Sequence, residues 1–262
     1  MPPPLPAEQI IALNKPKADL HTHRAYTWNG WEFDVPPGVF IPGATSRMIH
    51  QRVLDDDIDV RGRVYAAMGV GLGVEAIVAG LRGAARVHAL DVHPASVAAT
   101  ETGYHRIVGN DGGTEFLPQV SDLFAGLPDG TRLDTVTFNP PAVSRPVSED
   151  PDIVRNVCAG TPVTDAFFTQ LAERDLLAPD GAVYFVASNT ADLRHIIGHA
   201  TTVGFTANIH HLHDWNDGVL TYLFRLTRDP ETISEAAAAS GTDSATEAAT
   251  TSEPGPNVEA GR

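Results

Sequence analysis

The sequence predicts an α/β fold of the doubly wound class, with a mostly parallel seven-stranded sheet that ends in a C-terminal antiparallel hairpin. Three observations predict it. Short apolar runs alternate with helical segments between residues 63 and 203, which is typical of parallel strands joined by right-handed crossovers. A glycine-rich turn follows the first apolar run. The last two runs flank a polar turn at residues 214–218, which is a hairpin signal.

Local signals mark where the expected elements begin and end. Pro94 is tolerated in the first turn of a helix, where its missing N–H would have no partner. Pro179-Asp180-Gly181 is a turn signal that separates a helix from the next strand. The expected strands cover residues 63–68, 86–90, 105–108, 133–138, 181–187, 205–211 and 219–226. The expected helices cover residues 74–84, 164–177 and 192–203, with another beginning at Pro94.

The chain divides into three expected regions. Residues 1–60 form an N-terminal arm with a lid or substrate segment, and its first dozen residues predict only a loose structure. Residues 61–229 form the domain that carries the site. Residues 230–262 form an acidic tail of mostly small and polar residues. Such a composition cannot bury enough apolar surface to offset its ordering entropy, so we expect this tail to be disordered.

Composition narrows the classes of function. A formal net charge of −15 disfavours nucleic acid as a partner, because phosphate binding depends on clustered Lys and Arg. Cys158 is the single cysteine, which excludes an internal disulfide and a multi-cysteine metal site. No run of about 18 apolar residues occurs, and the N-terminus lacks a signal-peptide pattern. We therefore expect a cytoplasmic protein with no membrane partner and no metal.

The glycine-rich turn is the first candidate for ligand binding. Gly69, Gly71 and Gly73 lie between the first strand and its helix, where glycines allow a tight turn and the close approach of a ligand. Asp91 follows the next strand, where its carboxylate can accept hydrogen bonds from a ribose. This spacing fits a methyl-donor site, but it also fits a nicotinamide dinucleotide site or a purely structural turn.

The Asn139-Pro140-Pro141 segment favours the methyl donor among these alternatives. It follows the fourth strand and so lies at the carboxyl edge of the sheet, where ligands bind in this architecture. The prolines fix φ and remove two backbone donors, which leaves the local carbonyl oxygens as rigid acceptors. Together with the Asn side-chain oxygen, they can hold an N–H group so that the nitrogen lone pair points at a methyl sulfonium. Positioning is most of what methyl transfer requires.

From about Phe33 to Leu226 the chain resembles the HemK-like N5-glutamine methyltransferases. The resemblance rests on Val39-Phe-Ile-Pro42, Gly69-x-Gly71-x-Gly73, Asp91-Val-His-Pro94, Val120-Ser-Asp-Leu-Phe124 and Phe138-Asn-Pro-Pro141. It implies a Rossmann-like class I methyltransferase fold with S-adenosyl-L-methionine as cofactor. It also implies ribose contact by Asp91, adenine contact near His93, Asp122 and Leu123, and target binding by Asn139 and Pro140.

These motifs define the expected site. Asn139 and Pro140 are the expected catalytic residues. The expected cofactor-binding residues are Gly69, Gly71, Gly73, Asp91, His93, Asp122, Leu123 and Asn139. The expected substrate-binding residues are Trp31, Phe40, Asn139, Pro140, Pro141 and Ala142.

Departures from the family pattern predict a changed substrate. Ala67 stands where an acidic residue usually precedes the glycines, and Arg47 stands at another acidic position. Ala142 replaces the aromatic residue that normally follows the two prolines. Trp31 in a lid could supply the missing aromatic surface. The arm is also short for the helical N-terminal domain with which family members grip release factors.

The expected function is therefore S-adenosylmethionine-dependent N-methylation of an amine, amide or guanidine nitrogen in a small metabolite, such as a cationic amino acid. The alternative within the class is a protein-glutamine N-methyltransferase. Alternatives from other classes are an NAD-dependent oxidoreductase and a non-catalytic donor-binding protein. We expect a small-molecule substrate rather than a nucleic acid, and a homodimer is compatible with the sequence.

A histidine cluster near the C-terminal hairpin is a further polar feature. His210, His211 and His213 precede Asp214. Histidines are common at exposed strand ends, and no carboxylate lies at a firm metal-ligand spacing. We therefore expect the cluster to provide polar cover for the site rather than to bind a metal.

Overall fold

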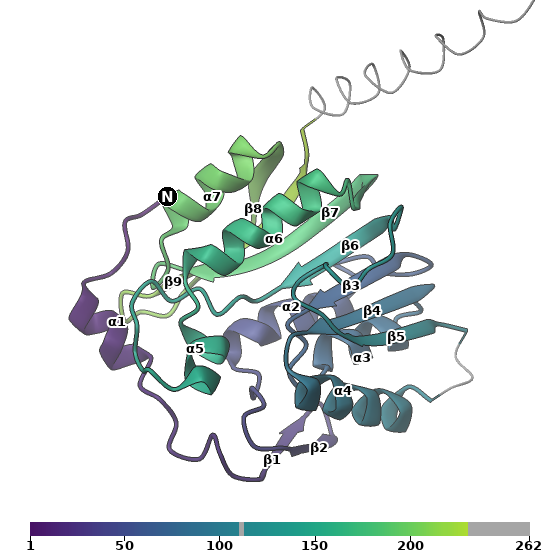
Figure 1. The fold of residues 1–262 in the computed structure, drawn as a ribbon, viewed down its shortest axis with the longest axis horizontal. Helices are drawn as coiled ribbons and strands as arrows, with labels where there is room; N and C mark the ends of the chain where they lie inside the picture. Colours follow the sequence, from purple (N-terminus) through teal and green to yellow (C-terminus); the bar gives the residue numbers. More distant parts are fainter. Residues whose placement is uncertain (110–112, 230–262) are drawn as a thin grey trace, which may run out of the picture. The chain divides into compact units, whose positions relative to one another are not determined.

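The computed structural model describes residues 1–109 and 113–229, so the predicted tail at residues 230–262 lies outside the described residues. Residues Met1–Arg228 form one compact unit. The central sheet contains β3 (Val64–Met68), β4 (Arg86–Asp91), β5 (Glu115–Val120), β6 (Leu133–Phe138), β7 (Leu177–Ser188), β8 (Phe205–Asp214) and β9 (Leu220–Arg228). Their order across the sheet is β5-β4-β3-β6-β7-β9-β8 (Figure 1).

The direction of the strands confirms the predicted fold class. The first five strands in that order are parallel, whereas β9 is antiparallel to both β7 and β8. The chain order reverses between β3 and β6, because β3 is followed by β4 on one side and flanked by β6 on the other. Such a reversal opens a crevice at the carboxyl ends of the strands.

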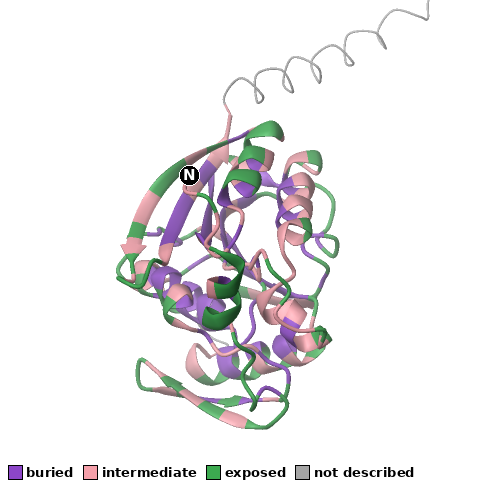
Figure 2. Ribbon diagram, turned by 90° about the vertical axis from the view of Figure 1, so that its left-hand side faces the viewer, coloured by how far each residue is buried: buried purple, intermediate pink, exposed green. Residues whose placement is uncertain are grey.

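Helices cover both faces of the sheet. They are α2 (Ala44–Leu54), α3 (Val74–Leu81), α4 (Pro94–Ile107), α6 (Thr161–Glu173) and α7 (Leu193–Thr202). Along β3, Tyr65 and Ala67 pack in one core with α2, α3 and α4, while Ala66 and Met68 pack in another with α6 and α7. This alternation follows from the two-residue period of a strand. Figure 2 shows the buried residues concentrated in the sheet and on the helix faces against it.

The arm contains regular structure that the sequence did not predict. It forms α1 (Ala7–Leu13), an antiparallel hairpin of β1 (Arg24–Trp28) and β2 (Trp31–Val35), and then α2. The loose structure expected for the first dozen residues is therefore wrong. Ile10 of α1 is fully buried, and the Leu5 amide donates to the Asn189 carbonyl oxygen. These contacts hold the start of the chain against the body.

One predicted strand is wrong in position. Residues 105–108 were expected as the third strand, but α4 continues to Ile107 because Thr100, Gly103 and Tyr104 are buried at helical spacing. The third strand is β5 instead, and the Tyr104 ring stacks on Phe116 of that strand with centroids 3.7 Å apart. β5 contains Pro118, which is tolerated because β5 is an edge strand of the sheet.

The region around residues 161–181 also differs from the prediction. The helix expected at residues 164–177 is α6, which ends at Glu173, and Leu177 already belongs to β7. The turn signal at residues 179–181 lies inside β7, where the pairing with β6 shifts register. One more helix, α5 (Pro151–Val157), was not predicted. Among the described residues, no helix is long and apolar enough to cross a membrane.

Candidate active site

A cavity of about 400 Å³ lies at the carboxyl ends of the parallel strands, where the strand order reverses. Its walls come from the glycine turn, the end of β4, the loop after β5, the segment after β6, α5, the end of β7 and the arm. A volume of this size is within the range of small-ligand sites, roughly 300–1,000 Å³. The cavity brings together most of the predicted residues: Phe40, Gly69, Gly71, Asp91, Asp122, Leu123, Asn139, Pro140, Pro141 and Ala142.

The glycine turn supplies backbone groups to one wall. Gly69 and Gly71 line the cavity and have φ values of 66° and 53°, in the left-handed region that favours glycine. A Cβ on Gly71 would lie 3.3 Å from the Phe40 carbonyl oxygen, so the turn packs closely under the arm. Gly73 does not line the cavity. A Cβ there would lie 2.4 Å from Thr100 Cγ2, which indicates a role in packing α3 against α4.

Asp91 lines the cavity and is held by two backbone amides, while its contact with a ribose stays a prediction. Its Oδ2 accepts from the Gly71 amide at 3.0 Å, and its Oδ1 accepts from the His93 amide at 2.8 Å. Burial raises the pKa of this carboxyl, and the two backbone hydrogen bonds oppose that rise. A carboxylate has about four acceptor positions, so two remain for hydroxyl groups of a ligand.

His93 reaches the site through its backbone rather than its ring. Its ring Nδ1 lies 3.1 Å from Ser96 Oγ at the start of α4, and the residue is not among those that line the cavity. Burial lowers the pKa of the ring, and the nearby Arg155 lowers it further. The residue therefore orients Asp91, and a direct adenine contact stays a prediction.

The loop after β5 forms a second wall. Asp122 and Leu123 line the cavity together with Val92, whose side chain is 53% exposed. Ser121 Oγ donates to the Leu123 carbonyl and accepts from the Gly126 amide, which fixes the loop while Leu123 adopts a φ of 51°. Apolar side chains beside a carboxylate suit a flat heterocycle with polar edges.

Asn139 follows β6 and is placed by the aromatic core beneath it. The ring of Phe138 packs against Phe167, with centroids 4.8 Å apart. Asn139 Nδ2 donates to Ser46 Oγ of α2 at 2.9 Å. The amide nitrogen of Asn139 is therefore bound to Ser46, and Asn139 Oδ1 is the atom left to accept an N–H group in the cavity.

The two prolines behave differently from the prediction. Their carbonyl oxygens were expected to stay available, but Pro140 O accepts from the Ala142 amide at 2.8 Å and Pro141 O accepts from the Gly160 amide at 3.1 Å. The first bond closes a tight turn after Asn139, and the second ties this turn to the segment that follows α5. Ala142 is 5% exposed and pairs with Cys158 in an isolated antiparallel bridge. The backbone that follows α5 thus covers Ala142, the position at which the family normally has an aromatic residue.

The arm contributes residues that the motifs did not reveal. Asn14 and Thr45 line the cavity with Phe40, and so do Arg155 and Asn156 of α5. No local pattern marks Asn14, because its place depends on the packing of α1. The signal for α5 was present, since Asp150 caps the helix by accepting from the Asp152 amide and Pro151 occupies the first turn, a typical helix start.

Two other predicted features lie away from the cavity. Trp31 packs against Trp28 within the arm hairpin, with ring centroids 5.5 Å apart, and it is not among the lining residues. The histidine cluster lies on β8, the last strand in the sheet order. There His210 contacts Asp57 at 3.1 Å and His213 packs on Trp215. Polar cover for the site is therefore wrong for this cluster, because β7 and β9 separate it from β6.

Comparison with known proteins identifies the class. No protein-family model matches the chain. Release factor glutamine methyltransferase from Burkholderia pseudomallei is 29% identical over 187 residues, which cover 69% of this chain and 62% of that protein. The fold resembles the T. thermophilus 16S rRNA methyltransferase in complex with AdoMet and guanosine, with a TM-score of 0.52, 19% identity, and coverage of 79% of this chain and 50% of that one. It also resembles the E. cuniculi Mtq2–Trm112 complex that methylates eRF1, with a TM-score of 0.51, 16% identity, and coverage of 73% and 99%.

The fold is that of the class I S-adenosylmethionine-dependent methyltransferases, as predicted. Within this class the chain is similar to a release factor glutamine methyltransferase, which confirms the HemK-like resemblance seen in the motifs. The chain spans 62% of the length of the curated relative.

The predicted partner is wrong. We expected a small-molecule substrate and no nucleic acid, but these relatives are named for a release factor, the eRF1 termination factor and 16S rRNA. The expectation depended on a net charge of −15 and on a short arm. Net charge describes the whole surface and does not determine the local field at a cavity.

Proposed function

We propose that the chain methylates the side-chain amide nitrogen of a glutamine in a protein, with S-adenosylmethionine as the methyl donor. The observation that carries this proposal is the hydrogen bond from Asn139 Nδ2 to Ser46 Oγ. It leaves Asn139 Oδ1 to accept an N–H from the target, and a primary amide has two such hydrogens. The named target of the release-factor relative supports the same chemistry.

The donor side of the cavity fits the proposed methyl donor. Asp91 retains acceptor positions for the two hydroxyls of a ribose, and Val92 and Leu123 offer apolar surface for an adenine. Ala67, which is fully buried in β3, has a methyl group in place of the acidic side chain common in this family. The amino-acid end of the donor would instead meet the backbone of Gly69 and Gly71. When bound, S-adenosylmethionine supplies an already activated methyl group and becomes S-adenosylhomocysteine, and the amide nitrogen releases one of its two hydrogens as a proton when it gains the methyl group.

The protein's part in the reaction is then positioning and exclusion of water. Asn139 Oδ1 accepts one amide hydrogen and turns the target nitrogen towards the donor side. The turn closed by the Pro140 carbonyl, which the Pro141 carbonyl ties to Gly160, holds Asn139 in place. Phe40 and Phe138 bring apolar surface to the cavity, which excludes water around the reacting groups. Holding the reactants in one geometry contributes most when the donor needs no further activation.

The arm is proposed to contribute to the target side as well as to the cover of the donor turn. Asn14 and Thr45 reach the same cavity as Asn139, so residues 1–60 contribute to the wall that a protein segment would enter. Residues 61–229 then hold the donor and the Asn139 segment. Trp31 lies in the hairpin rather than at the cavity, so this contribution does not depend on it.

The test is to incubate the protein with methyl-labelled S-adenosylmethionine and, separately, with a purified release factor, transfer RNA or ribosomal RNA. We expect label on a glutamine of the release factor, found by peptide mass spectrometry, and labelling slowed by more than about a hundredfold with Asn139→Ala. Asn208→Ala changes an exposed asparagine of β8 and should leave labelling unchanged. Label in RNA alone would assign a nucleic-acid target. Binding of NAD without binding of S-adenosylmethionine would remove the methyltransferase assignment, and donor binding without any labelling would favour a non-catalytic protein.

A further inference from the structure

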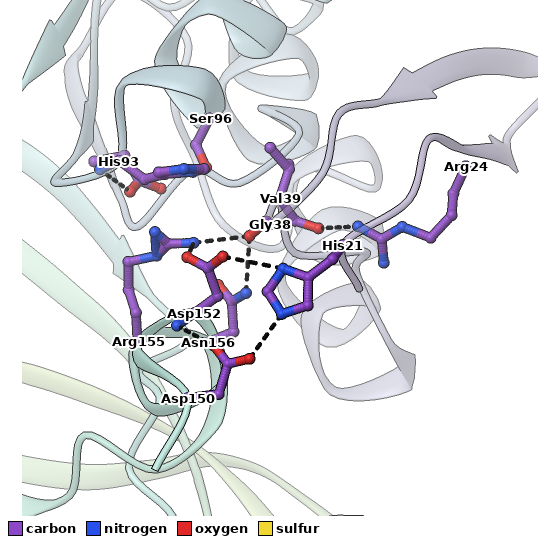
Figure 3. Close-up of polar contacts among 11 residues, drawn as sticks. His21, Arg24, Gly38, Val39, His93, Ser96, Asp150, Asp152, Arg155 and Asn156 are labelled. Carbon is purple, nitrogen blue, oxygen red and sulfur yellow. Dashed lines mark hydrogen bonds and ion pairs between the residues drawn. The ribbon is translucent and has the colours of Figure 1, made fainter. Parts of the chain in front are cut away.

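The Gly38 carbonyl oxygen lies where α5 meets the arm. Arg155 Nη2 donates to it at 2.8 Å and Asn156 Nδ2 donates to it at 3.0 Å (Figure 3). On the other side of the loop, the Gly38 amide donates to the Leu20 carbonyl at 2.8 Å, and Arg24 Nη2 donates to the Val39 carbonyl at 2.7 Å. The loop that carries Phe40 is therefore held from both sides.

Charged groups on α5 reinforce this contact. Arg155 pairs with Asp152 at 2.8 Å, so its guanidinium bridges a carboxylate and the Gly38 carbonyl. His21 Nε2 lies 2.7 Å from Asp150 Oδ2, and its Nδ1 lies 3.5 Å from Asp152 Oδ2. Figure 3 shows the His21 ring reaching across from the arm to both carboxylates. We call His21, Gly38, Asp152, Arg155 and Asn156 the α5 clasp.

His21, Asp150 and Asp152 resemble a cation site, because their ligand atoms lie within 4.8 Å of one another. The geometry argues against it. Each nitrogen of the His21 ring faces a different carboxylate, whereas a metal needs one nitrogen and the carboxylates to converge on one point. Arg155 already places a positive charge on Asp152. The arrangement is that of linked ion pairs between two segments.

The α5 clasp joins the two halves of the cavity. Its arm side carries Phe40, whose carbonyl oxygen packs over Gly71 of the donor turn. The other side of α5 is tied to the Asn139 segment, since the Val143 amide donates to the Val157 carbonyl and Cys158 pairs with Ala142. A shift of α5 would thus move the cover of the donor turn and the segment after Asn139 together.

We propose that Arg155 is a positioning residue that holds the Phe40 loop over the donor turn through the Gly38 carbonyl, and so couples closure over the donor to ordering of the target segment. This inference rests on the proposed methyltransferase function. Arg155 acts through Gly38 and Phe40 in this role. Asn156 provides the second donor to the same oxygen, and His21 and Asp152 hold the guanidinium and the helix in register with the arm.

The first experiment measures the clasp without any ligand. Hydrogen–deuterium exchange of the full chain should be followed in peptides that contain the Gly38 and Val39 amides. We expect Arg155→Met and Asn156→Ala to speed their exchange by about tenfold, since each removes one hydrogen bond to Gly38. Arg132→Met is the matched control, because Arg132 pairs with Asp175 at 2.7 Å and does not line the cavity. Unchanged exchange in both clasp variants would overturn the inference.

The second experiment measures the coupling to the donor site by calorimetric titration of S-adenosylhomocysteine, the demethylated donor. Arg155→Met should raise Kd by about tenfold, and Arg155→Lys should recover part of the affinity, since a single ammonium can replace one of the guanidinium contacts. His21→Ala should raise Kd in the same direction by a smaller factor, although His21 does not line the cavity. If only Arg155→Met weakens binding and exchange is unchanged, Arg155 touches the donor directly and its positioning role is wrong.

The outcomes separate this inference from the proposed function. Faster exchange in the clasp variants, with no S-adenosylhomocysteine binding by the unmodified protein, would remove the methyltransferase function and the coupling with it, while the clasp contact would stand. Normal donor binding in every variant would retain the function and overturn the coupling. Weaker donor binding together with faster exchange would support both.

Discussion

The donor side and the target side of the cavity are built in different ways. On the donor side, the Gly71 amide donates directly to the Asp91 carboxylate, and both residues belong to neighbouring strands and their turns. On the target side, Asn139 is oriented by Ser46, which lies 93 residues earlier in the chain. The donor side therefore depends mainly on local backbone geometry, and the target side depends on side chains brought together from distant segments. The donor site should therefore tolerate a change at Ser46 better than the target site does.

Replacing Asn139 gives the sharpest test of this division. Asn139→Ala should lower kcat by more than about a hundredfold, because losing the group that orients the nucleophile costs on the order of 3 kcal/mol in the transition state. The Kd of S-adenosylmethionine should change only a few-fold. Single-turnover labelling and calorimetric titration measure the two effects. Proportional loss of donor affinity would place Asn139 on the donor side and break the comparison.

The same division explains what the sequence could predict. The glycine turn, Asp91 and Asn139 follow strands directly, so strand periodicity alone predicts that they meet at one edge of the sheet. Asn14 and Arg155 could not be predicted in this way, because α1 and α5 are short and take their positions from tertiary contacts. The strand prediction at residues 105–108, next to Tyr104, was wrong for a related reason. Its short apolar run is compatible with a strand or a helix, and burial along α4 decided between them.

Gly73 tests whether the donor side is set by packing as well as by ligand contact. Gly73→Ala should lower the free energy of unfolding by about 2–4 kcal/mol, because a left-handed φ is unfavourable for alanine and the new Cβ would overlap Thr100. Gly130→Ala is the matched control, since Gly130 has the same φ of 77° and nothing within 4 Å of its Cβ position. It should cost only about 1–2 kcal/mol. Urea unfolding of the two variants measures the difference, and equal losses would show that crowding against Thr100 is unimportant.

Asp91 tests the ligand contact itself. Asp91→Ala should weaken donor binding by about 10- to 100-fold, since each hydrogen bond to a charged group contributes roughly 1.5–3 kcal/mol. Asp180→Ala, at an exposed aspartate of β7, should have no effect on calorimetric titration. An unchanged Kd in Asp91→Ala would show that the ribose is held elsewhere.

Asp91 also predicts how donor affinity depends on pH. Burial raises the pKa of its carboxyl above the usual value of 3.8, and only the ionised form can accept hydrogen bonds with both oxygens. Donor affinity should therefore fall as the pH drops through this raised pKa, and the fall should begin at a higher pH than for an ordinary aspartate. Titrations between neutral pH and the onset of acid unfolding measure it. A constant affinity over that range would mean that the bound donor does not need the charged carboxylate.

The smallest expected effect comes from Ser46, and it separates positioning from direct contact on the target side. Ser46 is 3% exposed and its hydroxyl accepts from Asn139 Nδ2, so Ser46→Ala frees the amide to rotate while leaving Asn139 present. A neutral hydrogen bond contributes about 1 kcal/mol, which corresponds to roughly a fivefold loss in kcat. Ser46→Thr keeps the hydroxyl and should retain most of the rate, and donor affinity should stay unchanged in both variants. If Ser46→Ala instead matched Asn139→Ala in its loss of rate, Ser46 would hold the target itself, and the division between an orienting arm and a binding Asn139 would have to be redrawn.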